Sequence, residues 1–115
     1  YFPRLKGRIL FVEEDEAETP KSLDRMFTQL RQMGAFEQIS GLVVGRLPRC
    51  VGFTPEDSLE MILATALKGH KFPVITDVDF GHTDPLHTIP LGVRCLMDTA
   101  KGDISLLEAG CRPSN

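Results

Sequence analysis

The stretch that decides the fold is the run RILFV at residues 8–12, which lies between Gly7 and Glu13. Four of its five residues form an unbroken apolar row, and two of them are β-branched. A short apolar run of this kind is typical of a strand that is buried on both faces, as in a parallel sheet. We therefore expect a buried strand that ends near Glu13.

A helix is predicted downstream of this strand. Thr19 is a favourable N-cap residue, and Pro20 suits the first helical position. Apolar residues then recur at the spacing i, i+3, i+4, i+7 and i+10, which marks one face of a helix. They are Leu23, Met26, Phe27, Leu30 and Met33. Gly34 is placed to end the helix in a left-handed conformation.

The same alternation of strand and helix continues along the chain. A second buried strand is predicted over residues 39–45, and a third over residues 72–76. Between them, the segment TPED at residues 54–57 indicates a helix start with acids in the first turn. Gly69 follows the last apolar position of that helix and is expected to end it.

The last part of the chain carries two more strand patterns after a polar loop at residues 77–90. They lie at residues 91–97 and 104–107, and a turn around residues 101–103 predicts that they form a hairpin. The order strand, helix, strand, helix, strand, strand, strand predicts an α/β fold. We expect one domain over residues 1–115, with a partly parallel sheet, two main helices and a C-terminal antiparallel hairpin.

Length and composition restrict the classes of function. The chain has 115 residues, a net charge of −3, and 42% hydrophobic and 25% charged residues, which is the balance of one globular domain. No apolar run approaches the roughly 20 residues of a membrane helix, and no basic cluster suggests nucleic-acid binding. The three cysteines, without a CxxC pair, predict reduced thiols in the cytoplasm; they are Cys50, Cys95 and Cys111.

The acidic stretch EEDEAE at residues 13–18 is the first candidate for chemistry. Most of these acids are interpreted as a solvated loop, and their spacing does not match an EF-hand. Glu13 differs from the others because it directly follows a buried strand. Open α/β sheets place their functional groups at the carboxyl ends of strands.

The segment DVDFGHTDPLH at residues 77–87 is the second candidate, with two His and three Asp after a strand. A polar turn with capping acids is the plain interpretation. A metal-dependent hydrolase remains an alternative, with Asp77, Asp79, His82 and His87 as ligands, although the zincin spacing and an HxH pair are missing. The third hypothesis is an acid/base role for His82, which lies beside a glycine at a strand end. His70 and His87 are interpreted as a solvated helix-end residue and a loop residue.

A nucleophile for such an acid/base pair is not evident. A Glu that orients a His usually serves a Ser or Cys, yet the chain has no GxSxG motif and no glycine-rich oxyanion loop. None of the serines has an activated context: Ser22, Ser40, Ser58, Ser105 and Ser114. Cys50 follows Pro48-Arg49 without a group that would lower the pKa of its thiol. The residues therefore indicate two members of a triad without the third.

Several segments together resemble one known family. They are GRILFVEE at 7–14, ISGLVVGR at 39–46, FPVI at 72–75, DFGHTDP at 79–85 and IPLG at 89–92. In this order they are similar to the C-terminal domain of the LD-carboxypeptidase family of serine peptidases. That family includes muramoyltetrapeptide carboxypeptidases and microcin C immunity proteins. The acidic loop with Pro20 is more similar to the microcin-immunity branch.

The resemblance implies a role for particular residues. The triad Glu corresponds to Glu13, with Glu14 as the alternative, and the triad His corresponds to His82. The Ser and the oxyanion hole belong to an N-terminal domain that the 115-residue chain does not contain, while the C-terminal domain is of the swivelling β/β/α type. No metal or organic cofactor is implied. The implied substrates are the L,D bond before a terminal D-Ala in cytoplasmic murein peptides, as in peptidoglycan recycling, or the amide of a peptidyl-adenylate antibiotic.

These hypotheses carry structural expectations. A Glu13 carboxylate oxygen should lie within hydrogen-bond reach of a His82 ring nitrogen, with Asp79 and Asp84 bonded to loop backbone groups. An apolar face should mark where the N-terminal domain docks, with residues 1–3 as the linker, and should lead the isolated chain to self-associate as a homodimer. A non-enzymatic binding domain that uses the same loops is the remaining alternative.

Overall fold

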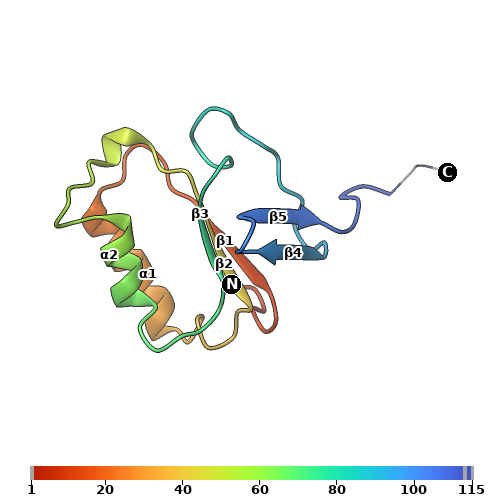
Figure 1. Ribbon diagram of the computed structural model, residues 1–115, viewed down its shortest axis with the longest axis horizontal. Coiled ribbons are helices and arrows are strands. Elements are labelled where there is room, and N and C mark those ends of the chain that lie inside the picture. The colour runs from red at the N-terminus through yellow and green to blue at the C-terminus, as the bar shows by residue number, and fades with distance from the viewer. Residues whose placement is uncertain (1, 113, 115) are drawn as a thin grey trace.

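The computed structural model describes residues 2–112 and 114, and its elements alternate as expected. They are β1 (Ile9–Val12), α1 (Pro20–Gln32), β2 (Gly41–Gly45), the short 3-10 helix η1 (Arg49–Val51), α2 (Leu59–Ala66), β3 (Val74–Val78), β4 (Cys95–Asp98) and β5 (Asp103–Leu106). Strands β1, β2 and β3 form a parallel sheet with β2 in the middle, and β4 pairs with β5 as an antiparallel hairpin. Figure 1 shows the two helices on one face of the parallel sheet and the hairpin on the other. The predicted α/β class is therefore confirmed.

The central strand β2 explains why three layers form. All five of its residues are buried. Leu42 and Val44 belong to the core cluster that also holds Phe27 of α1. Because side chains alternate along a strand, Gly41, Val43 and Gly45 lie on the opposite face, toward the hairpin layer. Gly41 is one of these, and a Cβ added there would lie 2.5 Å from Met97 Sδ of β4. The strand thus buries one face against helices and the other against the C-terminal part of the chain.

The predicted boundaries of α1 are confirmed. The Ser22 backbone N–H donates to Thr19 Oγ1 at 3.3 Å, and the Thr19 N–H donates to Ser22 Oγ at 2.8 Å, which completes a capping box. Pro20 occupies the first position of the helix. Gly34 follows the C-cap Met33 and has a φ of 72°, so it adopts the left-handed conformation that was predicted to end the helix.

Two predicted boundaries are shifted by local chemistry. Helix α2 begins after Ser58, whose side chain accepts the Met61 N–H at 3.2 Å, and not at residues 54–57. The Thr54 hydroxyl instead accepts the Asp57 N–H at 3.0 Å and closes a turn before the helix. Strand β3 begins at Val74 and not at residue 72, since Pro73 has no N–H to donate to the sheet.

The C-terminal hairpin is shorter than predicted, and its strands do not pair with the parallel sheet. Its strands are β4 and β5 where residues 91–97 and 104–107 were expected. Leu91 is 89% exposed and Gly92 has a φ of 78°, so the chain turns there and extends only from residue 95. The hairpin forms a separate two-stranded sheet, and the expected antiparallel addition to the parallel sheet is wrong in that respect.

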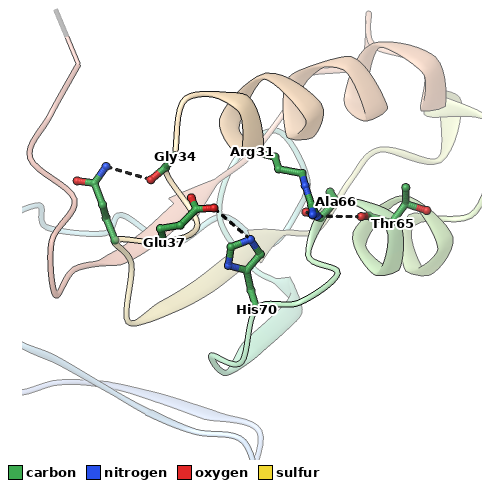
Figure 2. A network of polar contacts seen from close by, with 7 residues as sticks. Arg31, Gly34, Glu37, Thr65, Ala66 and His70 are labelled. Carbon is green, nitrogen blue, oxygen red and sulfur yellow. Dashed lines mark hydrogen bonds and ion pairs between the residues drawn. The ribbon is translucent and has the colours of Figure 1, made fainter.

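Polar contacts join α1 to α2 and connect the loops that precede β2 and β3 (Figure 2). Arg31 Nη1 donates to the Ala66 carbonyl at 2.7 Å and to the Thr65 carbonyl at 3.3 Å, at the C-terminal end of α2. His70 Nε2 lies 3.6 Å from Glu37 Oε1, and its side chain is only 15% exposed. The prediction of a solvated His70 is therefore wrong, because the ring packs near two phenylalanines, Phe36 and Phe72.

Replacement of Arg31 by alanine is expected to lower the free energy of unfolding by about 1 kcal/mol, because the final carbonyls of α2 lose a charged donor. The expected loss of free energy is small since Arg31 is an exposed residue. Urea titration of the two proteins measures the difference. Arg25→Ala, an exposed position on the same helix, is the control and should change the unfolding free energy by less than about 0.5 kcal/mol. Equal losses in both variants would contradict the capping role.

Candidate active site

Glu13 directly follows β1, at the carboxyl end of the parallel sheet. Side chains alternate along the extended chain, so Phe11 and Glu13 lie on the same face. The Phe11 ring contacts Phe80, with ring centroids 5.5 Å apart. This face is the one opposite the helices, and it carries the loop that follows β3.

That loop contains His82. It leaves β3 with Phe80, which is 7% exposed and whose N–H donates to the Val78 carbonyl at 2.8 Å. The loop closes on itself where the His87 N–H donates to the Asp79 carbonyl at 2.8 Å. A buried aromatic at one end and a backbone bond across its base hold the loop over the carboxyl edge of the sheet.

The expected contact between Glu13 and His82 is present. His82 Nδ1 lies 2.7 Å from Glu13 Oε2, although the two residues are 69 positions apart. The side chains are 54% and 37% exposed respectively, so the pair is open to solvent. Because Nδ1 is engaged by the carboxylate, Nε2 is the ring atom available for proton transfer. Among the described residues, Glu14 makes no hydrogen bond to His82.

The surroundings change the ionisation of His82 and of the neighbouring Glu14. The hydrogen bond that His82 donates to Glu13 raises the pKa of His82, desolvation opposes that rise, and the charges of Glu13, Asp15 and Glu16 add to it. Burial also raises the pKa of Glu14, as does the nearby charge of Glu18. The histidine is thus held as a stronger base than a free imidazole, as general-base catalysis favours.

Two glycines allow the close approach. Gly81 has a φ of 106°, and a Cβ there would lie 3.0 Å from both Glu13 Cβ and Glu13 Oε2. A Cβ on Gly45, the last residue of β2, would lie 2.6 Å from the Phe80 carbonyl oxygen. Gly45 was not among the predicted site residues. A glycine at the end of a buried strand was the available signal, since it permits another backbone to approach.

The other acidic and histidine candidates do not gather around His82. Within residues 2–112 and 114, no three His, Cys, Asp or Glu side chains come close enough to hold a metal ion. Asp79 Oδ1 lies 2.9 Å from Arg46 Nη2, so the expectation that its side chain bonds to loop backbone is wrong. His87 contributes its backbone N–H to the loop. Asp77 lies within β3 and has a φ of 59°.

A nucleophile is not found beside the pair in the described part of the chain. Ser22 and Ser58 cap the two helices. Cys50 Sγ donates to the Glu16 carbonyl at 3.5 Å. His82 has no hydrogen bond to a serine or cysteine among the described residues. Among the described residues, the candidate site therefore consists of the His82–Glu13 pair without an adjacent nucleophile.

An apolar groove of about 330 Å³ lies between β1 and the hairpin. Its lining includes Ile9, Phe11, Pro90, Leu106 and Leu107. Leu106 and Leu107 are 42% and 53% exposed. Pro3 is also exposed, while Tyr1 of the expected linker lies outside the described residues. Exposed apolar side chains are thus present beside the sheet, as expected for a face that another domain covers.

None of the described helices is long and apolar enough to cross a membrane.

Comparison with known proteins identifies the family. Residues 1–97 match the LD-carboxypeptidase C-terminal domain. The chain is 33% identical over 106 residues to the microcin C7 self-immunity protein MccF of Escherichia coli, covering 90% of this chain and 30% of that protein. It is 31% identical over 107 residues to a probable murein peptide carboxypeptidase of Bacillus subtilis, covering 91% of this chain and 33% of the relative.

Solved structures agree with the sequence relatives. MccF in complex with aspartyl sulfamoyl adenosine superposes with a TM-score of 0.84 at 28% identity, covering 96% of this chain and 32% of that one. The chain thus spans about a third of the length of the relatives it matches. The fold and the sequence point to the same group of proteins, and the chain belongs to the LD-carboxypeptidase family as its C-terminal domain.

Proposed function

We propose that this chain is the C-terminal domain of a serine carboxypeptidase and supplies the His and Glu of a Ser-His-Glu triad. The observation that carries the proposal is the 2.7 Å contact between Glu13 Oε2 and His82 Nδ1 at the carboxyl edge of the sheet. The membership in a carboxypeptidase family supports it. The serine and the oxyanion donors come from an N-terminal domain of the whole protein.

The proposed reaction is acyl transfer to that serine and then to water. His82 Nε2 accepts the serine proton while the hydroxyl oxygen attacks the amide carbonyl, and the same nitrogen then gives the proton to the leaving amine. A water molecule, deprotonated by His82, releases the acid in the second half of the reaction. Glu13 accepts the Nδ1–H, fixes the tautomer and stabilises the imidazolium.

Two amide substrates fit this proposal. One is the L,D bond of a murein tetrapeptide, supported by the relative named a probable murein peptide carboxypeptidase. The other is the amide of a peptidyl-adenylate, supported by the microcin immunity relative and by its complex with aspartyl sulfamoyl adenosine. Both would be met in the cytoplasm, where we place the activity.

The test is an assay of the full-length protein with both substrates. We expect hydrolysis of at least one, loss of that activity after treatment with a fluorophosphonate that acylates active serines, and no loss in EDTA. Inactivation by EDTA with restoration by a divalent metal would favour the metal-dependent alternative. Binding of a substrate without turnover would favour a non-enzymatic binding domain.

The pH dependence gives a sharper expectation. A general base must be neutral, so kcat/KM falls as the pH drops through the pKa of His82. Glu13 raises this pKa, and Glu13→Gln should therefore move the midpoint of the acid limb to lower pH, in addition to its effect on rate. The measurement is the pH profile of kcat/KM in both full-length proteins. An unchanged midpoint would show that Glu13 does not tune the base.

The proposed partner is the N-terminal domain, docked at the edge that carries Glu13 and His82 and over the adjoining apolar groove. In the isolated chain this groove is uncovered, and we expect self-association at high concentration. Sedimentation velocity measures it. Leu106→Ser, at an exposed position in the groove, should weaken the association, while a chain that is monomeric at all concentrations would contradict it.

A further inference from the structure

Arg46 connects the central strand to the loop that carries His82. It is the first residue after β2, and its backbone N–H donates to the Val78 carbonyl at 2.8 Å. Its Nη2 atom lies 2.9 Å from Asp79 Oδ1. One residue thus contacts the end of β3 through its backbone and the start of the loop through its side chain.

Asp79 Oδ1 is shielded from solvent and accepts no hydrogen bond of good geometry among the described residues. Arg46, whose side chain is 43% exposed, is its only ion-pair partner there. An exposed ion pair usually contributes little because water replaces either partner. Here Oδ1 is shielded from water while the Asp79 side chain as a whole is 29% exposed, so without Arg46 this oxygen would have no cation beside it and the carboxylate would turn toward solvent.

Asp79 also fixes the base of the loop, since its carbonyl accepts the His87 N–H at 2.8 Å. His82 lies midway between these two residues. A shift of Asp79 toward solvent would therefore move both ends of the segment that presents the imidazole. The contact between His82 and Glu13 has little tolerance for such a shift, because Gly81 lies directly against the Glu13 side chain.

We propose that Arg46 is a positioning residue, which holds the loop of residues 79–87 through Asp79 so that His82 Nδ1 reaches Glu13. Arg46 acts only through this loop and does not contact the imidazole. The kinetic consequence rests on the proposed function, but the structural consequence does not. The two can therefore be tested separately.

The structural test is NMR of the imidazole nitrogens in the 115-residue chain. In the unsubstituted chain the neutral ring should carry its proton on Nδ1, where Glu13 accepts it. Arg46→Gln should shift the neutral ring toward the Nε2–H tautomer and lower the pKa of His82. Removal of a positive charge without movement would raise that pKa, so the direction separates positioning from simple electrostatics.

Matched variants complete the test. Arg49→Gln removes the same charge from an exposed position three residues away and should leave the tautomer unchanged. Asp79→Asn should shift the tautomer as Arg46→Gln does, and the double variant should be no worse than either single one. Arg46→Lys should restore part of the effect. If Arg46→Gln does not fold, Asp79→Asn carries the test, and an unchanged Nδ1–H tautomer in that variant overturns the proposal.

In the full-length protein, Arg46→Gln should lower kcat by about 10- to 100-fold with little change in KM, as expected for a misplaced base. Activity that survives His82→Ala, together with the expected NMR change, would refute the proposed function and leave the positioning role intact. Loss of activity in His82→Ala with a silent Arg46→Gln would refute the positioning role alone.

Discussion

The 115-residue chain alone is expected to release no product from a murein tetrapeptide or a peptidyl-adenylate. Its His82–Glu13 pair can move a proton, but the reaction also needs a nucleophile and oxyanion donors. Removal of a whole triad costs about 10⁶-fold in kcat, and the residual rate comes from the oxyanion hole and substrate binding. The chain is expected to lack these as well, so product formation should match the buffer blank in a chromatographic assay.

Addition of the separately produced remainder of the protein is the positive control and should restore turnover in proportion to complex formation. The same addition to a His82→Ala chain should restore nothing. Turnover by the chain alone that disappears in His82→Ala would contradict the expectation. It would show that a nucleophile lies within these residues, in spite of the capping roles of Ser22 and Ser58.

The elements that sequence patterns predicted well are those in which local signals agree. Helix α1 has its cap, its proline, its apolar stripe and its terminal glycine in register, and each is used as expected. Strand β1 follows from an uninterrupted apolar run. Where two signals compete, the prediction failed: Thr54 and Ser58 are both suitable caps, and only their side-chain hydrogen bonds decide between them.

The hairpin shows the limit of strand patterns. Residues 91–94 continue the apolar pattern of β4, yet the chain is irregular there and Leu91 is exposed. Apolar side chains that lie on the surface have the same sequence signature as buried ones. The hairpin lies across the face of the parallel sheet where Met97 packs against Gly41, and a contact between residues so far apart in the sequence leaves no local pattern.

The site was predictable only in part. Glu13 and His82 could be found because both follow short apolar strands, and parallel strands bring their carboxyl ends to one edge. The sequence left Glu14 as an alternative to Glu13, and only the 2.7 Å contact of Glu13 with His82 distinguishes the two. The ion pair between Arg46 and Asp79 could not be predicted, because it depends on the adjacency of β2 and β3, which the sequence patterns do not specify.

Replacement of His82 by alanine in the full-length protein is expected to lower kcat by about 10³-fold or more with little change in KM, since the base acts on the reacting atoms and not on substrate binding. Glu13→Ala should cause a loss of the same order. Without the carboxylate, the neutral imidazole loses its fixed tautomer and its imidazolium loses its counter-charge. Steady-state kinetics of purified proteins, with circular dichroism to show that they fold, measure both effects.

Glu14→Ala is the matched control, because Glu14 is the neighbouring acid in the sequence. Its loss should change kcat only slightly, since it makes no hydrogen bond to His82 among the described residues. The combination of His82→Ala and Glu13→Ala should be little worse than His82→Ala alone, because Glu13 acts through the histidine. A severe loss in Glu14→Ala with a nearly silent Glu13→Ala would reverse the assignment of the triad acid, in spite of the 2.7 Å contact that favours Glu13.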